Sequence, residues 1–82
     1  MAKTFHFTIA HVGDSVFDGD VVSARIPGNE GLFEVLADHE AFITHTKEGM
    51  IRITLPNGSL QEIPIAQDGV VEVSHNQATL LL

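Results

Sequence analysis

The sequence predicts an all-β domain, a sandwich of short and mostly antiparallel strands. Three observations lead to this class. Apolar side chains alternate with polar ones over short runs, which is the pattern of half-buried strands. Turn residues separate those runs at intervals of about 8–12 residues, a spacing typical of sandwiches and barrels. No window of the 82-residue chain carries a clean helical stripe of apolar residues.

The expected strands follow from the period of two. In the first run Phe5, Phe7 and Ile9 alternate with polar or small neighbours. Successive side chains of a strand point to opposite faces, so these three are expected to face one core. The same alternation recurs along the chain. The expected strands cover residues 5–10, 21–26, 50–55, 62–65, 71–73 and 78–82.

Turn signals lie between these runs. Asn57-Gly58 is the strongest hairpin signal, because both residues tolerate positive φ. Pro64 cannot donate a hydrogen bond to a sheet, so its strand is expected at an edge or with a bulge at that residue. The other expected turns are Val12-Gly13-Asp14, Asp18-Gly19-Asp20, Pro27-Gly28-Asn29, Lys47-Glu48-Gly49, Gln67-Asp68-Gly69 and His75-Asn76-Gln77.

Length and charge exclude several classes of protein. Eighty-two residues are expected to form one domain, residues 1–82, with a thin core and no deep cleft. The net charge of −7 argues against nucleic acid and against adsorption to anionic lipid. No apolar run is long enough to insert into a bilayer or to resemble a signal peptide. The absence of cysteine excludes disulfides and thiolate zinc sites.

No residue pattern predicts catalysis, a cofactor or a metal. On an unbroken strand His39 and His45 would share a face but lie about 20 Å apart, and His6 and His11 would fall on opposite faces. No serine stands in a nucleophile-elbow context. The aspartates of residues 14–20 do not fit a calcium loop, and the glycine-rich stretch 28–31 lacks the lysine of a phosphate loop.

Several adjacent pairs of apolar residues interrupt the alternation. In a strand one member of each pair must face away from the core. Several exposed apolar side chains together indicate that a partner covers an outer face. The pairs are Val21-Val22, Leu32-Phe33, Val70-Val71 and Leu80-Leu81-Leu82.

One long stretch, residues 16–53, resembles a known family. Its features in order are Phe17 and Gly19 before a strand, the G-x-x-G loop of Gly28 and Gly31, an apolar strand leading to His39, then Thr44 and the run Gly49 to Ile53. Residues 4–7, 68–73 and 76–81 match as well. Together they are similar to the N-terminal domain of the epsilon subunit of bacterial and chloroplast F-type ATP synthases, called delta in mitochondria.

The resemblance implies a ten-stranded β-sandwich in the central stalk of a proton- or sodium-translocating ATP synthase. Such a subunit is non-catalytic and has no cofactor. It couples rotation of the ring of c subunits to the gamma subunit and the catalytic head. Its place is peripheral, at the cytoplasmic face of the bacterial inner membrane. The family continues into an inhibitory C-terminal helical hairpin, which residues 1–82 do not include, so we expect this chain to lack that switch.

The resemblance also implies two contact surfaces. The residues expected to contact the polar loops of the c-ring are Gly28, Asn29, Glu30, Gly31, Leu32 and His39. Those expected to contact gamma are Thr8, Ala10, His11, Phe42 and Thr44. Glu30, Asp38 and Glu40 are expected to form an acidic tip that meets basic residues of the ring.

Two alternatives remain open at this point. Biotinyl and lipoyl carrier modules are also small, acidic and all-β, but they need a lysine between methionines at a hairpin tip. Lys47 is the only candidate and lacks those methionines. A small jelly-roll protein that binds a metal through its histidines is the other alternative.

Overall fold

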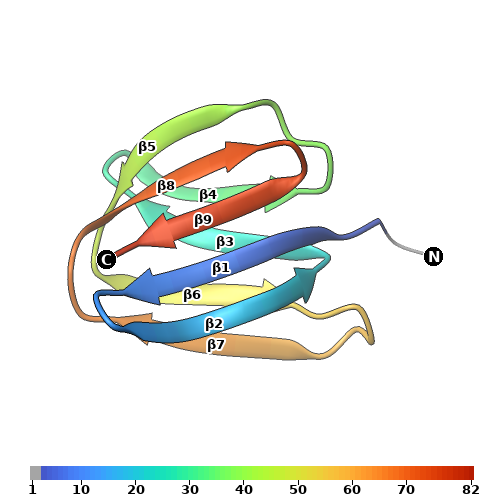
Figure 1. Cartoon of the computed structure of the whole chain (residues 1–82), viewed down its shortest axis with the longest axis horizontal. Helices are drawn as coiled ribbons and strands as arrows, with labels where there is room; N and C mark the ends of the chain where they lie inside the picture. Colours follow the sequence, from blue (N-terminus) through green and yellow to red (C-terminus); the bar gives the residue numbers. More distant parts are fainter. Residues whose placement is uncertain (1–2) are drawn as a thin grey trace.

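The computed structural model describes residues 3–82 and confirms the all-β class (Figure 1). The resemblance implied ten strands, and the described residues form nine. In chain order they are β1 (Phe5–His11), β2 (Asp14–Val21), β3 (Ser23–Gly28), β4 (Gly31–Leu36), β5 (Phe42–Thr46), β6 (Gly49–Thr54), β7 (Leu60–Ile65), β8 (Gly69–Ser74) and β9 (Gln77–Leu81).

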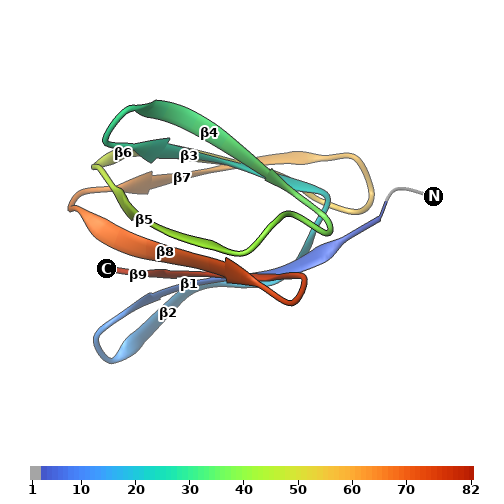
Figure 2. The same cartoon turned by 90° about the horizontal axis from the view of Figure 1, so that it is seen from above.

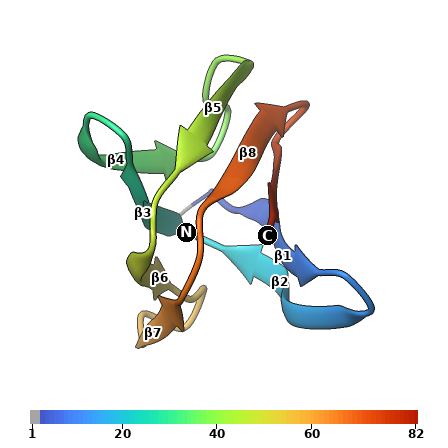
Figure 3. The ribbon, with the colours of Figure 1, turned by 90° about the vertical axis from the view of Figure 1, so that its left-hand side faces the viewer.

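The strands form one curled sheet that folds into two facing layers (Figures 2 and 3). The first layer has the order β2-β1-β9-β8-β5, and the second has the order β4-β3-β6-β7. Among these nine strands, only β1 and β9 pair in parallel. A single residue pair, Gly28 with Thr46, joins the layers between β3 and β5. Thr46 is buried there, and its hydroxyl has no hydrogen-bond partner among the described residues.

The core lies between the layers and confirms the alternation. Phe5, Phe7 and Ile9 are buried, and the Phe7 ring lies 6.1 Å from the ring of Phe17 on the neighbouring strand. Every further strand contributes buried apolar residues except β5, whose buried residue is Thr46 and whose Phe42 packs half-buried against the core. The remaining buried apolar residues are Val21, Ala24, Ile26, Val35, Ile51, Ile53, Ile63, Ile65, Val71, Val73, Ala78 and Leu80.

The apolar pairs have two different explanations. At Val21-Val22 the chain passes from the first layer to the second, and the Val22 amide donates to the Thr54 carbonyl. The alternation therefore restarts, and neither side chain is fully exposed. At the C-terminal end Leu80 is buried whereas Leu81 is 58% exposed. That second kind of pair places an apolar side chain on the outside, as predicted.

The Asn57-Gly58 hairpin and the edge position of Pro64 are both confirmed. Strands β6 and β7 pair around this turn, and β7 is the last strand of its layer. Of the two turn residues, Gly58 alone has positive φ, at 88°. The Asn57 side chain instead accepts hydrogen bonds from the amide and hydroxyl of Ser59. Asn57 therefore fixes the turn with its side chain, not with a left-handed backbone.

Asn76 connects three segments at one end of the sandwich. His75 and Asn76 both have positive φ, as a tight two-residue hairpin between β8 and β9 requires. The Asn76 side chain accepts from the Asp38 amide at 2.8 Å and donates to the Thr4 carbonyl at 2.8 Å. The loop after β4, the start of β1 and the β8–β9 turn are thereby held together. An exposed ion pair of Lys3 with Asp38 spans the same region.

Candidate functional site

The β3–β4 turn forms a narrow tip at one end of the second layer. Gly28 pairs with Gly31, and exposed Asn29 and Glu30 make the connection between them. Gly31 has φ of 118°, a value that side chains rarely allow. A Cβ added at Gly28 would lie 3.1 Å from both the Gly31 carbonyl oxygen and the Phe33 ring. The turn therefore needs a glycine at each of these two positions.

A shallow groove of about 550 Å³ begins at this tip. Aromatic rings line part of it: Phe33 meets Phe42 edge-on at 5.8 Å, and the His39 ring lies 4.9 Å from Phe42. His39 Nδ1 donates to the Glu40 carbonyl at 2.8 Å, which fixes the orientation of the imidazole. The groove residues are Gly28, Asn29, Glu30, Gly31, Leu32, Phe33, Glu34, His39, Phe42, Thr44 and His45.

The structure brings all six residues predicted for the c-ring contact into this one groove. It also places Phe42 and Thr44, which were predicted for gamma, in the same groove. The expected acidic tip is wrong in one respect. Glu30 precedes the six-residue strand β4, whereas Asp38 and Glu40 follow it. Such a strand is about 20 Å long, so these carboxylates lie at opposite ends.

The other predicted gamma residues lie on the first layer, away from the groove. Thr8 and Ala10 alternate with the buried residues of β1 and so face outward. Ala10 is paired with Leu81, and Leu81 with Val70 on β8. Ala10, Leu81 and Val70 thus form a short apolar row on the outer face of the first layer, which His45 continues on β5. Ile43 on β5 is 68% exposed but lies in the neighbouring row, where its partner is Glu72.

The sequence analysis did not identify Leu81 as a contact residue, and it included Ile43 only as the residue between Phe42 and Thr44. Leu81 belongs to an apolar pair, so the alternation did signal that it faces outward. Ile43 carried no such signal, because β5 was not among the runs with a clear period of two. Its outward orientation follows from its pairing with Glu72, whose neighbours Val71 and Val73 are buried.

A charged cluster lies beside the apolar row. His6 on β1 contacts Asp18 through Nε2 and Asp20 through Nδ1, the latter at 3.1 Å, and both carboxylates come from β2. The hydrogen bond with Asp20 and then that with Asp18 raise the pKa of His6 above its ordinary value. The Thr8 hydroxyl is 3.4 Å from the same Asp18 oxygen. The cluster therefore extends to a predicted gamma residue.

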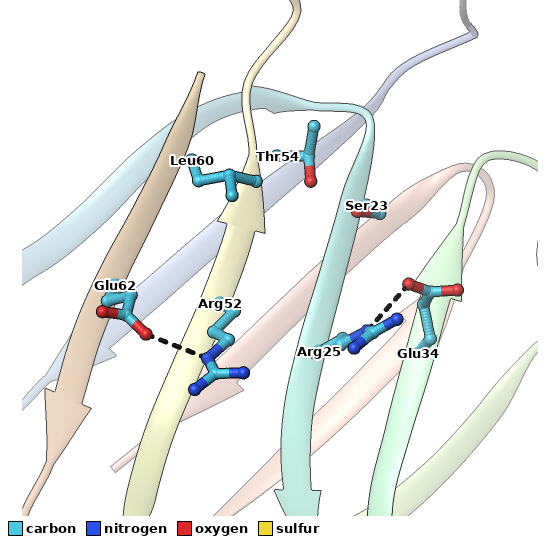
Figure 4. A pocket seen from close by; sticks show the side chains of 7 residues that line it. All are labelled: Ser23, Arg25, Glu34, Arg52, Thr54, Leu60 and Glu62. Carbon is cyan, nitrogen blue, oxygen red and sulfur yellow. Dashed lines mark hydrogen bonds and ion pairs between the residues drawn. The ribbon is translucent and has the colours of Figure 1, made fainter. Parts of the chain in front are cut away.

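The outer face of the second layer carries two ion pairs (Figure 4). Arg25 Nε donates to Glu34 at 3.2 Å, and Arg52 Nε donates to Glu62 at 2.9 Å. The sheet register places all four side chains in one row across β4, β3, β6 and β7. A groove of about 600 Å³ lies along this row, but its charges are already paired with each other. Its lining residues are Ser23, Arg25, Glu34, Arg52, Thr54, Leu60 and Glu62.

Neither groove has the arrangement of a reactive centre. Within residues 3–82, no three histidine or acidic side chains are grouped so that they could hold a metal ion. The same part of the chain contains no helix that could cross a membrane. The features that remain are surfaces: a glycine-built tip with its groove, an outer face with a short apolar row and a charged cluster, and a second outer face crossed by a row of ion pairs.

Sequence comparison decides the family. The family described as "ATP synthase, Delta/Epsilon chain, beta-sandwich domain" matches residues 4–82. This chain belongs to that family. The match covers almost the whole chain and confirms the resemblance and the β-sandwich class. It also decides between the three interpretations of the sequence in favour of the epsilon-like one.

Two epsilon chains show the degree of similarity. The ATP synthase epsilon chain of a Nitratiruptor species is 46% identical over 67 residues, which are 82% of this chain and 51% of the relative. That of a Bradyrhizobium species is 35% identical over 78 residues, which are 95% of this chain and 56% of the relative. The chain thus spans about half the length of these relatives.

Two solved structures share the fold of this family member. A chain of the Euglena gracilis mitochondrial ATP synthase, in a structure of OSCP/F1/c-ring, superposes with a TM-score of 0.88 at 20% identity, covering 95% of this chain and 49% of that one. A chain from the central stalk and c-ring of the Tetrahymena thermophila mitochondrial enzyme gives 0.70 at 14% identity, covering 98% and 63%. At these identities the likeness concerns the fold.

Proposed function

We propose that this domain is a non-catalytic part of the central stalk of an F-type ATP synthase, at the cytoplasmic face of a bacterial inner membrane. It couples rotation of the c-ring, driven by protons or sodium ions, to the gamma subunit and the catalytic head. The single observation that carries the proposal is the family match over residues 4–82. The domain neither makes nor hydrolyses ATP by itself.

The β3–β4 tip supports a contact with the c-ring. Glu30 is exposed at the turn, and the Leu32 side chain beside it is 68% exposed. A carboxylate next to an apolar side chain on a conformationally restricted turn suits a partner loop with a basic residue. Exposed charge pairs contribute only about 0.2–1 kcal/mol each, so Glu30 orients the contact more than it strengthens it. His39 lines the same groove and belongs to the same proposed surface.

The outer face of the first layer supports a contact with gamma. Thr8, Ala10 and His11 lie on β1, and the apolar row continues from Ala10 to Leu81 on β9 and Val70 on β8. A contiguous apolar surface is the usual mark of a protein interface. Phe42 and Thr44 line the groove instead, so we assign them to the ring side of the domain.

Site-specific crosslinking in membranes that contain the assembled synthase tests both contacts. Three cysteine variants of this cysteine-free chain suffice: Leu32→Cys at the tip, Ala10→Cys on the first layer and Glu62→Cys on the second layer. The expected crosslinks are to the c subunit from the tip and to gamma from Ala10. Glu62→Cys is the control and is expected to give neither. Failure of the chain to purify with gamma and the ring would contradict the whole proposal.

A further inference from the structure

One histidine on the outer face of the first layer is bonded to two carboxylates. His6 contacts Asp18 through one ring nitrogen and Asp20 through the other. A neutral imidazole carries one N–H and can donate one hydrogen bond, whereas the imidazolium form can donate to both aspartates. The geometry of the cluster therefore favours the protonated form of His6.

Among the groups around His6, the two aspartates are the ones that favour its protonated form. Hydrogen bonds that His6 donates to Asp20 and Asp18 raise its pKa, and no other charged group contributes to that shift. On the β9 side the register neighbour of His6 is Gln77, which is uncharged. Lys3, the basic residue that precedes β1, is paired with Asp38. No lysine or arginine of residues 3–82 pairs with either aspartate of the cluster.

We propose that the protein that covers this face places a basic side chain against Asp18 and Asp20. The positive charge of that side chain replaces the charge of protonated His6. This inference rests on the proposed function, in which that protein is gamma. Charge complementarity identifies the chemistry of the partner residue as arginine or lysine. The two carboxylates keep a net charge of −2 once His6 is neutral, in a chain whose total is −7.

The location of the cluster supports a contact with the same partner. Thr8, a predicted gamma residue, lies within 3.4 Å of an Asp18 oxygen. The apolar row that includes Ala10 and Leu81 runs beside it on the same face. A partner seated on that row would bring its rim residues to the cluster, and interface rims are commonly polar.

The exchange has a defined proton balance. At a pH below its pKa, His6 of the free domain holds one proton more than a neutral imidazole. On binding, that proton leaves to solvent, the remaining N–H still donates to one aspartate, and N–H groups of the partner bind both carboxylates. Binding therefore releases a proton, and the affinity rises as the pH rises through the pKa of His6. By reciprocity, the bound partner lowers that pKa.

The test compares binding of the domain to purified gamma at about pH 5.5 and about pH 8.5, on either side of the ordinary histidine pKa. We expect binding to be about two- to fivefold tighter at the higher pH, the size typical of an exposed charge pair. His6→Gln removes the titrating group and should abolish that difference. His75→Asn is the matched control, because asparagine tolerates the positive φ of this position. It should preserve the difference.

NMR titration of the His6 imidazole supplies a second readout. Its pKa should fall when gamma binds, and Asp20→Asn should lower it in the free domain. If gamma binds equally at both pH values, or if His6→Gln keeps the full pH dependence, the inference is overturned while the proposed function stands. If gamma does not bind at either pH, the proposed function itself fails.

Discussion

The outer faces of the two layers differ in the residues that they expose. On the second layer Arg25 and Arg52 are each paired with a glutamate on a flanking strand. On the first layer Leu81, in the short apolar row with Ala10 and Val70, is left exposed, and a charged cluster with His6 lies beside that row. Both faces belong to the same sheet and cover the same core.

The difference lies in how the charges on each face are paired, because both faces expose apolar side chains. On the second face two arginines and two glutamates satisfy each other, while Leu36, Met50 and Leu60 are exposed around them. On the first face two aspartates share one histidine beside the exposed Leu81, and exposed apolar area is favourable to bury when a partner arrives. The core cannot explain the difference, since it requires only the inward residues of each layer. The outward-facing residues therefore reflect whether each face contacts water or a protein partner.

The largest expected effect tests the core on which both faces depend. Phe7→Ala removes a fully buried ring between the layers and should lower the free energy of unfolding by about 3–5 kcal/mol. Urea unfolding followed by circular dichroism measures it. Ile53→Val, which removes one buried methylene, should cost about 1 kcal/mol and stays measurable if the alanine variant does not fold. Unfolding of one layer before the other would contradict a shared core.

The second prediction compares the two outer faces directly. Leu81→Asp on the first layer should weaken binding to gamma by at least about tenfold, because it places a charge in the centre of the apolar row. Leu60→Asp on the second layer is the matched control, since Leu60 is 77% exposed and should tolerate the change. Binding is measured by calorimetry with purified gamma. An equal loss in both variants would remove the distinction between the faces.

The third prediction concerns the junction of the layers. Thr46→Val replaces a buried hydroxyl that has no hydrogen-bond partner among the described residues. Because such a group loses its water without compensation, the variant should be more stable by about 1 kcal/mol. Thermal unfolding measures the change. A destabilised variant would mean that the hydroxyl has a partner, and a crystal structure of the unsubstituted chain would locate that partner or water.

The smallest effect is expected on the charged face. Arg52→Gln breaks the exposed pair with Glu62 and should cost less than about 1 kcal/mol, and less still at high salt. Affinity for gamma should not change, because this face lies on the other layer. A clear loss of binding would show that the second face also meets a partner.

The fold was largely predictable because burial follows a period of two. Phe5, Phe7 and Ile9 fell where the pattern placed them, and the Asn57-Gly58 turn and the edge position of Pro64 were confirmed. The parity change at Val22 could not be predicted, since it arises where the chain crosses between layers.

The candidate sites were less predictable than the fold. The tip residues are contiguous in sequence, so the G-x-x-G motif identified them together. His39, by contrast, joins them only through the packing of β4 against β3 and of its ring on Phe42. The cluster of His6 with two aspartates depends on the β1–β2 register, which includes a shift after Ile9. Sequence spacing alone does not set such a register.

The sequence by itself determined the all-β class, most of the inward residues and turns, and the family, because these depend on local periodicity and on motif order. The turn expected at Asp18-Gly19-Asp20 was wrong, because these residues lie inside β2 and pair with β1. Tertiary structure decided which outward residues share a face, which glycine turn borders which aromatic ring, and where a buried hydroxyl is left without a partner. The physical reason is that cross-strand neighbours are set by register and layer crossing. Two residues far apart in the chain, such as Ala10 and Leu81, become neighbours only when the sheet closes.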